Sequence, residues 1–201
     1  MALTHGTASV FTMQEVAQNT IVESTNVDIS NSYDTDLYLK QALTSETAHT
    51  GTLNVVQVNY TGDGDQGWVT HAKWVGPTGT GNTEATTIAT GVGTTSISYA
   101  SQTGYDMATK LGDERWRLIE DATFANSEFW EQVAAPNATQ STTRDPLSTA
   151  HAASSTLHNI AASYCIKLPI AQQVRVIADN TYDSDGSTVG IVAQVVKRTG
   201  L

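Results

Sequence analysis

The sequence is poor in cysteine, in basic residues and in long apolar runs. Its single cysteine, Cys165, excludes an internal disulfide and a cysteine-based zinc site, and its apolar neighbours predict a small buried side chain. With 10 Lys and Arg against 20 Asp and Glu, the formal net charge is −10, which argues against nucleic-acid binding because phosphate contacts need a basic patch. No apolar run approaches the roughly 18 residues of a membrane span. The first residues lack the basic and apolar regions of a signal peptide, so we expect synthesis in the cytoplasm and no membrane or nucleic-acid partner.

The abundant residue types predict β structure. Only 15% of the residues are charged, whereas Thr, Ser, Gly, Asn and Ala are common, and this composition favours strands with long loops over solvated helices. The 201 residues suffice for one large β domain or two small ones. No period of about 20 to 50 residues is apparent, which argues against a solenoid or a propeller.

Alternation of polar and apolar residues predicts several strands. Two β-branched runs, 173–179 and 189–196, flank a loop rich in Asn, Asp and Gly and are interpreted as an antiparallel hairpin. The runs 53–60 and 68–74 predict a second hairpin with an Asp-Gly loop. A further strand is predicted over 36–43, and weaker ones over 14–22 and 25–30.

The middle of the chain has a different pattern. After the polar stretch 76–84, residues 85–158 contain short strand segments at close spacing, which predict a small β-barrel inserted into the outer domain. The outer domain, residues 1–84 and 159–201, is predicted to be an antiparallel, jelly-roll-like β-sandwich, with residues 1–14 as an arm or an edge strand. The segment 126–135 fits a strand or a short helix that begins at Ser127. The predicted fold class is therefore all-β.

The sequence contains no set of residues that predicts catalysis or a resident cofactor. The five histidines are scattered and are interpreted as loop or interface residues, not as metal ligands. The Asp-Gly loops, one with Asp63 and Asp65 and one with Asp179, Asp183 and Asp185, lack the calcium-loop spacing and fit ordinary turns better.

Aromatic side chains give the second functional hypothesis. Trp68 and Trp74 are six residues apart, so a regular strand places them on one face, and a core role is favoured for both. If Trp68 is instead exposed, it forms with Tyr60, Asp63 and Asp65 a candidate ligand or interface site, because aromatic faces stack on sugars while carboxylates orient hydroxyls.

Several segments, taken in order, resemble a module in structural proteins of tailed-bacteriophage virions. The resemblance rests on the stretches 94–99, 110–121, 127–133 and 145–151, on Gly67-Trp68-Val69, and on the closing pattern Val174-Arg175-Val176, Asp179-Asn180, Gly186 and Val189. It implies a non-enzymatic virion component of the head or its decoration, which contacts other virion proteins and copies of itself. The alternative is a carbohydrate- or receptor-binding module of a tail or fibre protein.

Overall fold

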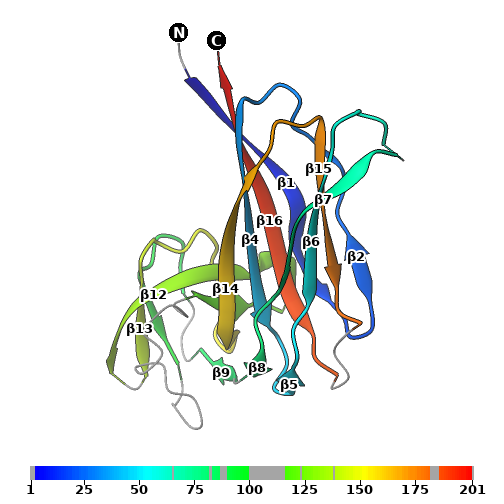
Figure 1. Cartoon of the computed structure of the whole chain (residues 1–201). Coiled ribbons are helices and arrows are strands. Elements are labelled where there is room, and N and C mark those ends of the chain that lie inside the picture. Colours follow the sequence, from blue (N-terminus) through cyan, green and yellow to red (C-terminus); the bar gives the residue numbers. More distant parts are fainter. Residues whose placement is uncertain are drawn as a thin grey trace.

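The computed structural model describes residues 3–64, 66–81, 83–86, 90–99, 116–122, 124–137, 139–181 and 186–200. Over these residues the chain is an all-β sandwich of antiparallel strands, with one short 3₁₀ turn at Phe124–Asn126. The predicted fold class is confirmed. Figure 1 shows the two sheets side by side, with strands β12 and β13 projecting from one flank.

The larger sheet has nine strands and contains both ends of the described chain. Its path is β1 (Leu3–Val16), β16 (Val189–Gly200), β4 (Asp34–Leu43), β14 (Thr156–Leu168), β11 (Trp116–Glu120), β12 (Glu128–Asn137), β13 (Gln140–Thr143) and β10 (Ser96–Ser98), while β9 (Thr83–Ala85) pairs with β14 off this path. Leu3 is paired with Gly200, so the two ends emerge together (Figure 1).

The smaller sheet has five strands and covers the first four strands of the larger one. Its path is β2 (Ile21–Glu23), β15 (Gln173–Asp179), β6 (Leu53–Asn59) and β7 (Trp68–Val75), and β3 (Val27–Asp28) also pairs with β15. A separate two-stranded pair, β5 (Ala48–His49) with β8 (Gly79–Thr80), lies at the end of the sandwich opposite the termini (Figure 1).

The main core lies between the two sheets. Leu37 and Leu39 of β4 and Ile191 and Val195 of β16 face Val176 of β15, and all five are fully buried. A reciprocal amide pair crosses the same interior, and Asn54 of β6 and Gln41 of β4 are both fully buried. This polar pair marks the end of the apolar core.

The predicted hairpin of 173–179 and 189–196 is wrong, although both strands exist. β15 pairs with β2, β3 and β6, whereas β16 pairs with β1 and β4 in the other sheet. The two strands therefore lie in different sheets. Alternation records only that one face of each strand meets the core, and this is equally true of two strands that face each other across a sandwich.

Other local predictions have mixed outcomes. The hairpin of β6 and β7 and the strand β4 are confirmed. Residues 3–16 form the edge strand β1 along β16, not a separate arm. Register shifts near Phe11 interrupt the alternation of β1, which is why the sequence shows a weak strand signal there. The segment 126–135 is mainly strand β12, preceded by the 3₁₀ turn, so the helix alternative is wrong.

The strands of the middle segment extend the larger sheet. β11 pairs with β14, and the path continues through β12, β13 and β10, while a single bridge from Thr86 to Tyr99 leads back toward β9. Among the described residues no continuous ladder closes these strands into the predicted barrel. They do enclose a core of their own, formed by Ile97, Tyr99, Ile119, Trp130, Leu147 and Leu157. The predicted boundary after residue 158 falls within β14, and the division into two domains stays a prediction.

Candidate functional site

The loop after β6 is built around one buried amide. The side-chain nitrogen of Asn59 donates to the carbonyl oxygens of Asp63 and Gln66, and its oxygen accepts hydrogen bonds from the backbone and hydroxyl of Thr61 at 2.8 and 2.9 Å. Gly67 closes the loop at φ 81°, a conformation that a side chain disfavours. This loop presents Tyr60, which is 52% exposed.

Trp68 lies beside this loop with its ring already in contact with other side chains. Its indole nitrogen donates to the carbonyl of Gly64 at 2.9 Å, and the guanidinium carbon of Arg175 lies 4.2 Å from the ring centroid. Arg175 also donates to Gln57 at 2.8 Å and forms an ion pair with Glu23. One face of the indole is therefore covered by a cation, which leaves less of it for a stacked ligand.

A β-bulge separates the two tryptophans that were predicted to share a face. Val56 pairs with Ala72 but Gln57 pairs with Thr70, so one extra residue in β7 reverses the alternation between them. Trp74 consequently points into the core, where its ring centroid lies 5.2 Å from that of Tyr164. The prediction of a shared face is wrong because a strand pattern does not reveal an inserted residue.

The remaining acidic candidates have ordinary roles or lie outside the described residues. Asp63 is exposed in the Asn59 loop, and Asp179 accepts hydrogen bonds from the backbone and hydroxyl of Thr181 at 3.0 and 2.6 Å, as in an ordinary turn. Asp65, Asp183 and Asp185 lie outside the described residues. Within the described ranges, no group of three or more His, Cys, Asp or Glu side chains could hold a metal ion.

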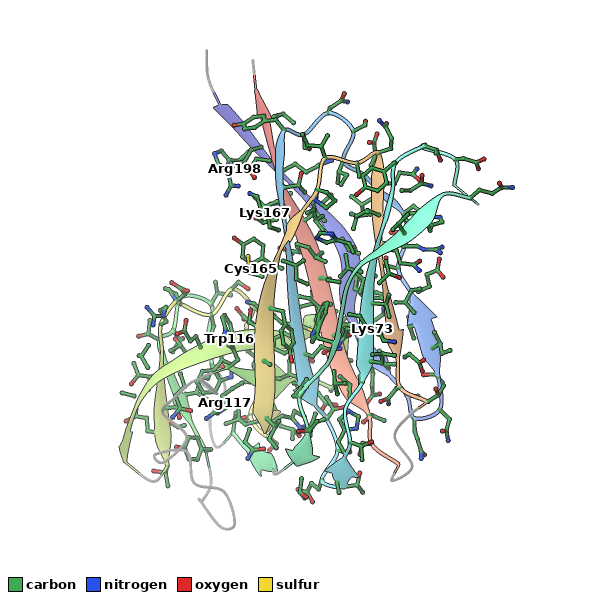
Figure 2. All side chains as sticks on the ribbon, in the orientation of Figure 1. Lys73, Trp116, Arg117, Cys165, Lys167 and Arg198 are labelled. Atoms are coloured by element: carbon green, nitrogen blue, oxygen red, sulfur yellow. The ribbon has the colours of Figure 1, made fainter. Side chains whose placement is uncertain are left out.

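Cys165 is exposed, contrary to the prediction of a buried side chain. It lies opposite Tyr38 on the outer face of the larger sheet, because β14 directs Tyr164 and Ile166 to the core instead. A hydrogen bond with Cys165 raises the pKa of the Tyr38 hydroxyl. Figure 2 shows Cys165 and Lys167 along the same strand.

The best-organised polar cluster was not predicted as a site and surrounds Glu128. Its carboxylate accepts hydrogen bonds from the backbone nitrogens of Ser148 and Thr149 at 2.8 and 3.0 Å and from the Ser148 hydroxyl at 2.8 Å. His151 is 2% exposed and lies between two carboxylates, 3.4 Å from Glu128 and 3.7 Å from Asp121. Glu128, the first residue of β12, thus holds the loop 145–151 in place.

A hollow of about 200 Å³ adjoins this cluster where the sandwich meets the middle segment. Lys40 of β4 projects into it with its ammonium 4.0 Å from the centroid of the Trp116 ring, and Glu131 and Asp145 lie at its rim. Burial lowers the pKa of Lys40, and the nearby carboxylates of Glu128, Asp145 and Glu131 oppose that effect. Lys40 therefore makes a cation–π contact with Trp116 and occupies this ring face.

The Glu128 carboxylate gives a prediction about how the stability of the fold depends on pH. Burial raises the pKa of Glu128, but hydrogen bonds from His151, Ser148 and Thr149 outweigh it, so the pKa lies below its ordinary value of 4.5. A depressed carboxyl pKa stabilises the fold above the unfolded pKa, and that contribution is lost as the pH falls through the folded pKa. We expect Glu128→Gln to lower the free energy of unfolding at pH 7 by about 2–3 kcal/mol and to flatten its decline in acid, measured by urea unfolding across pH.

Glu131→Gln is the matched control for this prediction. Glu131 pairs at 2.7 Å with Arg144, whose side chain is 51% exposed, so its removal should cost less than about 1 kcal/mol. Equal losses for the two variants, or an unchanged acid profile in Glu128→Gln, would contradict the assigned role of Glu128.

Comparison with known proteins adds little to this geometry. No family model matches the sequence, and no curated protein matches it. Among solved structures, the chain is similar to VP17, a capsid protein of bacteriophage P23-77, with 8% sequence identity, a TM-score of 0.20, and coverage of 100% of this chain and 98% of that one. A TM-score at this level carries no argument for fold or function. Over the described residues, no helix is both long and apolar enough to cross a membrane.

The sequence pointed to residues of the Glu128 cluster but not to their structural role. Three of the stretches that resemble phage virion proteins, 110–121, 127–133 and 145–151, contribute Asp121, Glu128 and His151 to it. The first part of the stretch 110–121 lies outside the described residues. Residues from three of these stretches therefore meet in one cluster that holds a loop in place.

Proposed function

We propose that this protein is a non-enzymatic structural component of a tailed-phage virion, a head decoration or head-associated protein that stabilises the particle through protein–protein contacts. The observation that carries the proposal is the Glu128 cluster. Residues from three of the stretches behind the sequence resemblance meet there, and the Glu128 carboxylate holds a loop in place through hydrogen bonds. Such use of motif residues suits a mechanical role.

The strand edges of the sandwich suit the same role. β1 and β7 lie at the ends of their sheet paths, so each has one edge without a strand partner in the described chain. Free strand edges pair readily with other chains, and many weak contacts add up in a symmetric shell. The partners in this proposal are the major capsid protein or neck and tail proteins, together with copies of the chain itself.

Particle composition tests the proposal. We expect the protein to co-sediment with purified particles at a fixed stoichiometry, measured by quantitative mass spectrometry, and to occupy defined positions in an electron-microscopy map. Particles that lack it should lose their contents at a lower temperature, and added protein should restore the wild-type temperature. Its absence from purified particles would overturn the proposal.

The exposure of Tyr60 beside Trp68 favours carbohydrate or receptor binding as the second candidate. Under the structural proposal, we expect no glycan-array signal from the wild-type protein. A signal that disappears in Trp68→Ala, with the circular dichroism spectrum unchanged, would favour the second candidate instead. Thr70→Ala, an exposed change two residues along the same strand, is the matched control.

A further inference from the structure

The outer face of the five-stranded sheet carries several aliphatic side chains among charged ones. In β15 the side chains of Val174, Val176 and Ala178 are fully buried in the core, so those of Arg175 and Ile177 point away from it. In β6 the same alternation sends Leu53, Val55 and Gln57 outward, and each is partly exposed. The solvent side of an antiparallel sheet is normally polar, so a group of aliphatic residues there needs an explanation.

The strand register arranges these residues in two neighbouring rows. The first row runs across the four strand positions as Glu23, Ile177, Val55 and Lys73, and the second as Ile21, Asp179, Leu53 and Val75. Ile21 and Val75, at opposite ends of the second row, are 59% and 55% exposed. We call Ile21, Leu53, Val55, Val75 and Ile177 the apolar face.

We propose that a second copy of this chain covers the apolar face, related to the first by a two-fold axis parallel to the strands and passing between β15 and β6. Such an axis exchanges β2 with β7 and β15 with β6 while each row stays level with itself. In the first row, Ile177 of one copy then meets Val55 of the other, and in the second row Asp179 of each copy lies opposite Leu53 of the other. An isologous contact of this kind requires a self-complementary surface.

Charge selects this axis. Glu23 ends the first row at the β2 edge, where it pairs with Arg175 of its own chain, and Lys73 ends the row at the β7 edge. The rotation therefore places Glu23 of each copy opposite Lys73 of the other. A two-fold axis perpendicular to the strands would instead bring β2 onto β2 and set like charges near each other. Lys73, on the β7 side in Figure 2, is exposed, and no carboxylate within ion-pair distance is found for it among the described residues.

The shape of the surface also fits this two-fold axis. A hollow of about 440 Å³ at the β7 end of the second row is lined by Leu53, Lys73 and Val75 with Thr50 and Gly51. Under the same rotation, the exposed Ile21 of the second copy faces this hollow. Gly51 is needed there, because its φ is 110° and an added Cβ would lie 2.1 Å from a methyl carbon of Val75. The surface therefore offers both a projecting side chain and a recess to receive it.

The size of the face sets the strength of the contact. The two rows span about three residues along four strands, so at about 3.3 Å per residue and about 4.8 Å between strands the face measures roughly 200 Å² per copy. Stable dimers bury about 800 Å² per partner, so the contact belongs to the weak class that depends on concentration. This inference names one surface for the self-contacts of the proposed function.

Reciprocal charge reversal tests the proposal in purified protein. We expect the wild-type chain to self-associate in sedimentation velocity as its concentration rises. Lys73→Glu and Glu23→Lys should each raise the dissociation constant about tenfold or more, because each dimer then contains two like-charge pairs. An equimolar mixture of the two variants should associate at least as well as the wild type, since both facing pairs are again opposite in charge.

Two further variants keep the test decisive. Lys197→Glu makes the same charge change on the larger sheet and should leave association unchanged, while Ile21→Asn, which alters no charge, should weaken it. Circular dichroism and melting temperature verify that each variant folds. A wild-type chain that stays monomeric at the highest concentration, or a mixture that fails to associate, overturns the proposal. Because no particle is used, such a failure is separate from a failure of the particle assays.

Discussion

Phe11→Ala is expected to lower the free energy of unfolding by about 3–5 kcal/mol, the usual cost of emptying a buried aromatic site. Phe11 belongs to the edge strand β1, yet it is only 2% exposed and lies in the core between the two sheets. Its partner in the register is Ala193 of β16, so a larger neighbour is not available there to fill the cavity. Urea unfolding followed by tryptophan fluorescence measures the loss.

Thr12→Ala supplies the control for this strand, because Thr12 is the exposed neighbour of Phe11. We expect that change to stay within about 0.5 kcal/mol of the wild type. If Phe11→Ala were equally mild, residues 3–16 would not contribute to the core, and the arm predicted from the sequence would be the better description.

Asn54→Leu is expected to cost about 2–5 kcal/mol, because it leaves a buried amide without partners. The side-chain nitrogen of Gln41 donates to Asn54 at 2.7 Å and that of Asn54 donates back at 2.8 Å, and both residues are fully buried. The pair joins β4 of one sheet to β6 of the other. Removal of either partner leaves a donor and an acceptor unsatisfied away from water.

A double-mutant cycle isolates this pair. Gln41→Met with Asn54→Leu replaces both amides by apolar groups, so the double variant should lose about 1–3 kcal/mol less than the sum of the single losses. Additive losses would show that the two side chains act independently. Gly76→Ala also tests the amide pair, since a Cβ added at residue 76 would lie 2.4 Å from the amide oxygen of Gln41.

The sequence predicted strands well because alternation is a local property. The runs 36–43, 53–60 and 68–74 are each a strand in the structure, and the alternation of buried side chains is clearest in β6. Pairing was less predictable, because a strand that faces the core looks the same whichever neighbours it has. The pairing of β15 and β16 in different sheets is a consequence of packing that no window of the sequence contains.

The candidate site was predicted only in part for a related reason. Tyr60 and Trp68 lie near one loop, as expected, but the stacking of Arg175 on Trp68 depends on the register between β15, β6 and β7. The bulge that turns Trp68 outward has no signature in a stretch that alternates acceptably on both sides of it. The Glu128 cluster needed contacts between residues about twenty positions apart, which only the fold supplies.

The position of β16 has a consequence for synthesis on the ribosome. β16 lies between β1 and β4, yet it is translated after every other strand of the larger sheet. Until β16 emerges, β1 has no strand partner in the described sheet and β4 lacks one of its two neighbours. The larger sheet therefore cannot be completed before β16 is translated. Completion of the sheet is then a late, long-range event, which predicts slow maturation and a need for protection by chaperones during translation.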